Sequence, residues 1–190
     1  MKLFEAVDVT TVFILAGGKS TRMGEDKALM AGGVARLRNL AMNAGVSRVV
    51  TLCGPAERME LFEGEVWPDP PSCRSLMDVL QWLFDETKDP VQLIPCDAFM
   101  LSDEGLSALL DSGGGVPIDP DGRRQPLLSH CPQDWVPEVE PSSILHMFSS
   151  LPSLSMTGLE QQMQNFNRPE ATFGGQGDQP PKDTGGVLRS

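Results

Sequence analysis

The sequence contains few of the residues from which metal centres and nucleophilic active sites are usually built. Its 190 residues include only two histidines, His130 and His146, too few for a histidine-based metal site. None of the four cysteines is spaced as a metal knuckle or a redox pair, so we expect them to act as small buried hydrophobic residues. No local pattern supports a Cys–His catalytic pair. The cysteines are Cys53, Cys73, Cys96 and Cys131.

Long apolar stretches are also missing. No run approaches the roughly 18–20 apolar residues that a membrane helix needs. The first ten residues, MKLFEAVDVT, have neither an apolar signal core nor a small-residue cleavage site. We therefore expect a cytoplasmic protein with no membrane partner. With 40% hydrophobic and 22% charged residues, the composition is that of a folded globular chain and excludes wholesale disorder.

Positive charge is scarce overall but is concentrated at the start of the chain. Fifteen lysines and arginines stand against 26 acids, and the net charge of −11 argues against nonspecific nucleic-acid binding. Residues 1–50 carry seven of these cations and four acids, whereas residues 51–190 are strongly acidic. The basic segment is therefore where we expect a small anionic ligand to be held.

Buried strands alternate with helices along most of the chain. Thr10–Leu15 is β-branched and apolar on both faces, as a buried parallel strand should be, and a helix is predicted over Val34–Ala44. The alternation predicts a three-layer, doubly wound, Rossmann-like α/β domain with a mostly parallel sheet over residues 1–170. The Gly-rich residues 171–190 are expected to be a flexible tail. Further strands are expected over Arg48–Cys53, Val91–Ile94, Val116–Ile118 and Gln125–Ser129, helices over Pro55–Phe62, Leu76–Phe84, Ser102–Leu110, Pro141–Leu151 and Gly158–Gln164, and a loop over the three-proline segment Trp67–Cys73.

A Gly-rich polar loop follows the first strand directly, at the end of the sheet where ligands bind in open α/β folds. Its Gly-Lys-Ser sequence is not a P-loop, because that motif needs a glycine five positions before Gly18 and the residue there is Phe13. The dinucleotide fingerprint fails as well, because the glycines are adjacent and then six residues apart. The loop does offer two glycines whose N–H groups can face oxyanions, Gly17 and Gly18, and two cations, Arg22 and Lys27.

The run LAGGKSTRMGEDK, residues 15–27, resembles the signature Leu-Ala-Gly-Gly-x-Ser-x-Arg-Met-Gly-x-Asp-Lys of the nucleotidyltransferases that share the molybdenum-cofactor guanylyltransferase fold. Every named position of the signature is met. The resemblance implies that the glycine turn contacts a nucleotide and that the two cations act in catalysis by holding its triphosphate. The residues so assigned are Leu15, Ala16, Gly17 and Gly18 for the nucleotide and Arg22 and Lys27 for the phosphates.

Two aspartates follow in the family's order. The segment VWPD, residues 66–69, resembles the strand end that carries a nucleotide-contacting aspartate, which implies that Asp69 binds the nucleotide. The segment PCD, residues 95–97, resembles the family's Cys-Asp metal motif. The resemblance implies that Asp97 contacts the nucleotide, takes part in catalysis and binds Mg²⁺, a hard ion suited to carboxylate, phosphate and water oxygens.

Later segments match less closely. Residues 165–170, NFNRPE, resemble the family's Asn-x-Asn-Thr-Pro-Glu, which implies acceptor-side roles for Asn165 and Asn167. Phe99 stands where the Cys-Asp motif has proline. The run RSLMD, residues 74–78, replaces the Gly-Pro-Leu-Ala-Gly usual in guanylyl enzymes, and its Ser-Leu resembles the related cytidylyltransferases instead. The match therefore supports the family more strongly than the identity of the base.

The resemblance implies a guanylyltransferase that moves GMP from GTP to the phosphate of molybdopterin and releases pyrophosphate, with Mg²⁺ as cofactor. A recipient molybdoenzyme or a chaperone would be a further partner. The acceptor phosphate is already ionised, so no side-chain nucleophile is needed. Two alternatives stay open: a related cytidylyltransferase or sugar-phosphate nucleotidyltransferase, and a noncatalytic nucleotide-binding module on the same fold.

Overall fold

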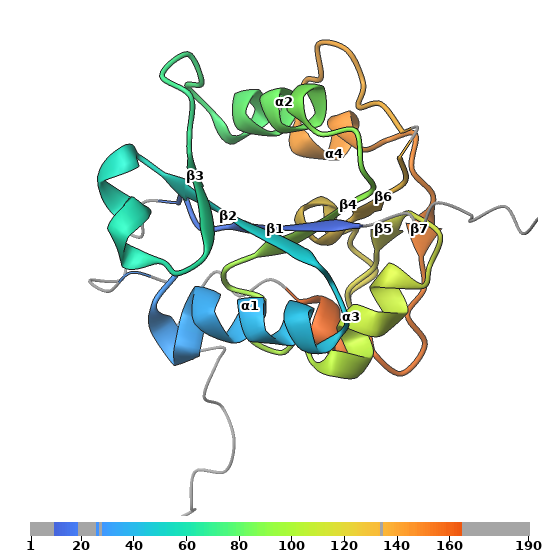
Figure 1. The fold of residues 1–190 in the computed structure, drawn as a ribbon. Coiled ribbons are helices and arrows are strands. Elements are labelled where there is room, and N and C mark those ends of the chain that lie inside the picture. Colours follow the sequence, from blue (N-terminus) through green and yellow to red (C-terminus); the bar gives the residue numbers. More distant parts are fainter. Residues whose placement is uncertain (1–9, 19–25, 27, 134, 165–190) are drawn as a thin grey trace, which may run out of the picture.

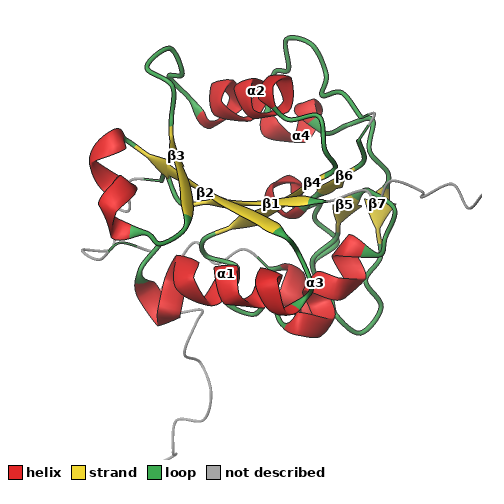
Figure 2. Cartoon of the chain, viewed as in Figure 1, coloured by secondary structure: helices red, strands yellow, loops and turns green. Residues whose placement is uncertain are grey.

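The computed structural model of the protein describes residues 10–18, 26, 28–133 and 135–164. The expected domain end at residue 170 and the expected tail lie outside these residues. Within them, no helix has the length and apolar character needed to cross a bilayer. The elements, coloured by type in Figure 2, are the strands β1 Thr11–Leu15, β2 Arg48–Gly54, β3 Glu65–Pro68, β4 Val91–Pro95, β5 Val116–Pro117, β6 His130–Cys131 and β7 Ser153–Leu154, the α-helices α1 Gly33–Asn43, α2 Leu76–Glu86, α3 Asp103–Leu110 and α4 Ile144–Met147, and the 3-10 helices η1 Met30–Gly32, η2 Ala56–Leu61, η3 Pro126–Leu128 and η4 Glu160–Met163.

A five-stranded sheet in the order β3-β2-β1-β4-β6 forms the centre of the molecule. β1 lies in its middle and pairs in parallel with β2 and with β4, and β3 pairs in parallel with β2. Only β6 runs antiparallel, against β4. β5 and β7 form a separate two-stranded parallel sheet. The predicted α/β fold with a mostly parallel sheet is confirmed.

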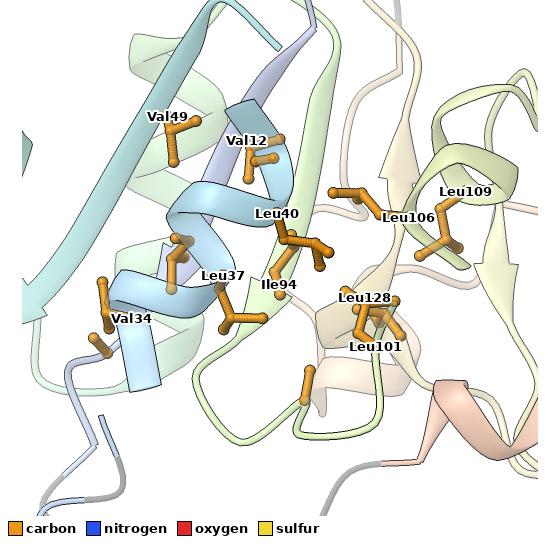
Figure 3. Close-up of a cluster of buried hydrophobic side chains, with 14 of the residues drawn as sticks. Val12, Val34, Leu37, Leu40, Val49, Ile94, Leu101, Leu106, Leu109 and Leu128 are labelled. Carbon is orange, nitrogen blue, oxygen red and sulfur yellow. The ribbon is translucent and has the colours of Figure 1, made fainter. Parts of the chain in front are cut away.

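Helices cover both faces of the sheet, which gives the three layers that Figure 1 shows: α1 and α3 on one face and α2 and α4 on the other. The face under α1 and α3 is filled by aliphatic side chains from strands and helices alike (Figure 3). Leu37, Ile94 and Leu106 are fully buried there. The amphipathic spacing of α1 places Val34, Leu37, Leu40 and Ala41 on its buried face, as helical periodicity requires.

The opposite face is richer in aromatic side chains. Phe13 of β1 meets Trp67 of β3 edge-on, with ring centroids 5.6 Å apart. The ring centroids of Trp67 and of Trp82 in α2 are 5.7 Å apart. α2 begins at Ser75, whose hydroxyl accepts a hydrogen bond from the backbone N–H of Asp78 while the Asp78 carboxylate accepts one from Ser75 N–H. This capping box satisfies two backbone donors that the first turn would otherwise leave unpaired.

Four elements expected from the sequence differ from those in the structure, in type or in length. The segment predicted as a loop from residue 67 begins inside β3, because Pro68 ends an edge strand, where a missing N–H does not interrupt the sheet. Gln125–Ser129 is the 3-10 helix η3 rather than a strand, with Pro126 at its first position, and the strand comes just after it. Pro141–Leu151 is helical only over α4, because Ser143 is extended and caps the helix. Gly158–Gln164 contains only η4.

Buried polar side chains lie in the sheet as well. His130 of β6 pairs with Gln92 of β4 across the antiparallel ladder, and both are buried. The ring Nδ1 of His130 has no hydrogen-bond partner, and burial lowers the pKa of this histidine below 6.5. The folded protein therefore holds a neutral imidazole that the unfolded chain protonates more readily.

Acid should destabilise the protein partly through this histidine. Because the folded pKa is depressed, the unfolded state binds more protons, and the free energy of unfolding falls as the pH is lowered through about 6.5. We expect His130→Gln to flatten the dependence of the unfolding free energy on pH between about 7 and about 5, whatever its effect at neutral pH. Urea denaturation at several pH values measures this slope. A wild-type slope for His130→Gln would contradict the prediction.

Candidate functional site

The four parallel strands end at one edge of the sheet, and their hydrogen bonding continues one residue beyond the paired ends. Ala16 N–H donates to the carbonyl of Leu52 at 2.8 Å. Cys96 N–H donates to the carbonyl of Leu15 at 3.1 Å, and Asp69 N–H donates to that of Gly54 at 2.8 Å. The loops that follow β1, β2, β3 and β4 therefore start side by side at this edge.

Two glycines allow the first two of these loops to touch through their backbones. An atom at the Cβ position of Gly17 would lie 3.0 Å from the Cα of Gly54, and one at Gly54 would lie 2.8 Å from the Cα of Gly17. Gly54 also has a φ of +80°, which L side chains rarely adopt. Position 54 therefore requires glycine because of both the close contact and the positive φ, whereas position 17 requires it because of the close contact alone.

Asp69 reaches the same place from β3. Its Oδ2 lies 3.6 Å from the position that a Cβ of Gly17 would occupy, so its carboxylate faces the glycine turn across the end of β2. Burial raises the pKa of the Asp69 carboxyl above 3.8, and the Arg58 cation opposes this shift. The side chain is thus a partly desolvated acceptor close to exposed backbone, which suits it to bind a hydroxyl or amino group of a ligand.

Asp97 stands on the other side of the glycine turn, two residues after the end of β4. It is buried, with 7% of its surface exposed. The turn that follows it is held by Arg36 of α1, whose guanidinium donates to the carbonyls of Ala98 at 2.7 Å and Leu101 at 2.9 Å. Burial lowers the pKa of Arg36, as expected for a cation removed from water.

Arg58 of η2 is a site residue that the sequence pattern did not indicate. Its guanidinium donates to the carbonyl of Ala16 and, at 2.8 Å, to that of Cys53, and it forms an ion pair with Asp26. These partners come from three different segments. Since Ala16 and Asp26 are distant from Arg58 in sequence, only the folded structure could reveal the cluster.

The structure brings together every predicted site residue that it describes. Leu15, Ala16, Gly17 and Gly18 form the end of β1 and its turn, with Asp69 and Asp97 on either side. Gly18 is exposed, and a Cβ there would meet no atom within 4 Å. The other predicted site residues, Arg22, Lys27, Asn165 and Asn167, lie outside the described part of the chain.

A hollow of about 390 Å³ lies elsewhere, against the small sheet and η4. Of the two acidic residues that line it, Asp119 is already engaged, because its carboxylate accepts hydrogen bonds from the N–H groups of Asp121 and Arg123 and from the Gln125 amide. None of the predicted site residues lines it.

These features define an α/β protein with a glycine turn at the carboxyl edge of its mostly parallel sheet, which is where open α/β proteins bind their ligands. The family comparison is more specific: the model of the MobA-like NTP transferase domain matches residues 12–146, and the chain belongs to this family. It is therefore a nucleotidyltransferase with a nucleoside triphosphate substrate. No curated protein sequence matches it significantly.

Solved structures share the fold at low sequence identity. The chain is similar to protein Aq1419 of Aquifex aeolicus VF5, with 18% identity and a TM-score of 0.63 over 84% of this chain and 94% of that one. It is similar to molybdopterin-guanine dinucleotide biosynthesis protein A of Archaeoglobus fulgidus, with 17% identity and a TM-score of 0.59 over 84% and 93%. Rv0371c of Mycobacterium tuberculosis H37Rv follows, with 17% identity and a TM-score of 0.52 over 77% and 87%.

The backbone contact between the two glycine turns can be tested with a matched pair of substitutions. Gly45 has a φ of +84° and Gly54 a φ of +80°, but a Cβ at Gly45 would meet nothing within 4 Å. Gly45→Ala should therefore cost only the conformational strain, about 1 kcal/mol of unfolding free energy. Gly54→Ala should cost at least about 1 kcal/mol more, because its Cβ overlaps Gly17. Chemical denaturation measures both; equal losses would show that the turns do not touch.

We expect the carboxylate of Asp69 to lower the free energy of unfolding and to strengthen nucleotide binding. Because its folded pKa is raised, the charged carboxylate disfavours folding above that pKa, and this penalty disappears at low pH, where the group is protonated in both states. We expect Asp69→Asn to raise the melting temperature, by more at about pH 7 than at about pH 4, and to weaken nucleotide binding. Melting curves and nucleotide titrations measure the two effects. The exposed Asp85, changed to Asn, is the control that should do neither. Asp69→Asn that melts below the wild type at neutral pH would contradict the expectation.

Proposed function

We propose that this nucleotidyltransferase transfers GMP from GTP to the terminal phosphate of molybdopterin and releases pyrophosphate. The observation that supports the proposal best is the convergence of the complete Leu-Ala-Gly-Gly signature start, Asp69 and Asp97 at one edge of the sheet, within a chain of the MobA-like family. The Archaeoglobus protein of similar fold is named for molybdopterin-guanine dinucleotide biosynthesis.

Each side of the site has a distinct role in this proposal. The backbone of Leu15, Ala16 and Gly17 receives the base, because the side chains of Leu15 and Ala16 are buried in the core and Gly17 has none to keep a planar ligand away. Asp69 accepts a hydrogen bond from the nucleoside. Arg22 and Lys27 hold the triphosphate, and Asn165 and Asn167 face the acceptor.

Asp97 fits a role in holding Mg²⁺. Among the described residues there is no group of three His, Cys, Asp or Glu side chains arranged for a metal. That is compatible with magnesium, which usually binds through one or two carboxylates together with substrate phosphates and water. Mg²⁺ bound there would reduce the negative charge of the triphosphate and of the transition state.

The chemical step needs little beyond alignment. An oxygen of the acceptor phosphate attacks the α-phosphorus of GTP and forms the new P–O bond, while the bond from that phosphorus to the bridging oxygen of the β-phosphate breaks. Pyrophosphate leaves with the electron pair. The chain's contribution is to hold donor and acceptor in line and to face the developing charge with Arg22 and Lys27.

The Ser-Leu resemblance to cytidylyltransferases has a structural explanation that does not involve the base. Ser75 and Asp78 form the capping box that begins α2, and Asp78 also accepts a hydrogen bond from Arg74 N–H at 2.7 Å. This run is therefore accounted for by the start of a helix, and we retain GTP as the proposed donor.

Nucleotide selectivity and turnover test the proposal in two measurements. GTP with Mg²⁺ should raise the melting temperature more than CTP, UTP or ATP does, and pyrophosphate should be released when a phosphorylated pterin acceptor is added. Selectivity for CTP would replace the donor in the proposal. GTP binding with no turnover would indicate a noncatalytic nucleotide-binding module.

Two substitutions test the assigned groups. Lys27→Ala and Asp97→Ala should each lower turnover at least about tenfold, equivalent to roughly 1.4 kcal/mol of activation free energy, because each removes charge stabilisation in the transition state. Lys88 and Asp85 are exposed residues at the end of α2, and Lys88→Ala and Asp85→Ala serve as controls that keep wild-type rates. Wild-type turnover in both test variants would overturn the assignment.

A further inference from the structure

Arg58 is the most highly connected cation at the described edge of the sheet. It lies on η2, after β2, and only 17% of its side chain is exposed. One terminal nitrogen, Nη1, donates to the carbonyls of both Ala16, the residue after β1, and Cys53, the penultimate residue of β2. The other, Nη2, is bonded to a carboxylate oxygen of Asp26. The planar fork of arginine can serve these three acceptors at once, which the ammonium of lysine cannot do in the same geometry.

Asp26 is held by its own segment as well. Its Oδ1 accepts a hydrogen bond from Ala28 N–H at 3.0 Å, and its backbone carbonyl accepts one from Leu29 N–H at 2.9 Å. Asp26 therefore caps a short turn with one carboxylate oxygen and bonds Arg58 with the other. Through this residue, Arg58 links the end of the signature to the glycine turn at its start.

The charge of Asp26 raises a difficulty for the proposed ligand. A nucleoside triphosphate carries several negative charges, and a nearby uncompensated carboxylate would repel it. Arg58 supplies the compensation from inside the protein, and its field also opposes the burial-driven rise in the pKa of Asp69. One cation thus acts on two of the acids at this edge.

We infer that Arg58 is a positioning residue for nucleotide binding: it neutralises Asp26 and fixes this residue, with the turn that it caps, against the ends of β1 and β2, so that the site accepts a polyanion. This inference rests on the proposed function for its ligand. Arg58 acts through Asp26 and the two carbonyls.

Comparison of the wild type with two single variants and their double variant separates this role from simple structural support. Arg58→Gln leaves Asp26 as an uncompensated charge and should weaken Mg²⁺-dependent GTP binding at least about tenfold, measured as a dissociation constant by titration. Asp26→Asn keeps the oxygen that caps Ala28 and should bind GTP within about threefold of the wild type. The double variant R58Q/D26N should recover most of the loss, because the repelling charge is gone.

Arg48 provides a matched control. It forms an ion pair of the same kind with Glu65, at 2.9 Å, but at the opposite ends of β2 and β3. Arg48→Gln changes the net charge by the same amount and should leave GTP affinity within about twofold of the wild type. If R58Q/D26N binds GTP no better than Arg58→Gln, or if Arg58→Gln binds as the wild type does, the inference is wrong.

A second readout does not depend on any nucleotide. Hydrogen exchange at the amides of Ala28 and Leu29, whose hydrogen bonds end on Asp26, should be faster in Arg58→Gln and unchanged in Arg48→Gln. If the wild type binds no nucleoside triphosphate, the proposed function fails, and this exchange experiment still decides the anchoring role of Arg58. Unchanged exchange in Arg58→Gln would overturn that role even in a protein that binds GTP.

Arg58→Lys keeps the test decisive if Arg58→Gln does not fold. It retains a cation beside Asp26 but loses the planar fork. GTP affinity should stay within about threefold of the wild type, while exchange at Ala28 and Leu29 should still rise. A tenfold loss of affinity in Arg58→Lys with unchanged exchange would contradict both parts of the inference.

Discussion

The site depends on the pairing of β1, which has a parallel neighbour on each side in continuous register. Thr11 to Leu15 are matched residue by residue with Arg48 to Leu52 on one side and with Val91 to Pro95 on the other. Parallel strands in register end together, so the residues that follow them are delivered to one edge without any contribution from the loops. The full burial of Val12, Phe13 and Ile14 makes this register hard to shift, because a slip would turn both faces of the strand out of their packing.

The edge formed in this way concentrates negative charge. It holds carboxylates at Asp26, Asp69 and Asp97, in a chain of net charge −11 whose family acts on nucleoside triphosphates, which are themselves anions. Within the described residues, two arginines on the protein side of this edge hold its acidic segments. Arg58 neutralises Asp26, and Arg36 supports the turn after Asp97 through two backbone carbonyls. The local balance of charge, rather than the net charge, decides what this edge can hold.

The sequence predicted those parts of the site that depend on neighbours in the chain. Gly17 and Asp97 each follow an apolar strand that the sequence pattern predicts, so strand order brings them to one edge. Asp69 was indicated only by the resemblance of residues 66–69 to a strand end, because β3 is short and was expected to lie partly in a loop. Arg58 could not be predicted, because two of its partners are a backbone carbonyl 42 residues earlier and a carboxylate 32 residues earlier. The same limit explains the error at η3. The apolar run around Pro126 is compatible with a strand or a turn, and long-range packing against β4 decides between them.

The short edge strand β3 has a consequence for how the molecule behaves among its own copies. An unpaired strand edge is a template on which another chain can add a strand. β3 offers only four residues, ends in Pro68, which has no N–H to donate, and begins at the charged pair of Glu65 and Arg48. A second copy would find few backbone groups to bind there. The sheet therefore terminates at β3, and the loop that carries Asp69 is protected from being covered by edge-to-edge aggregation.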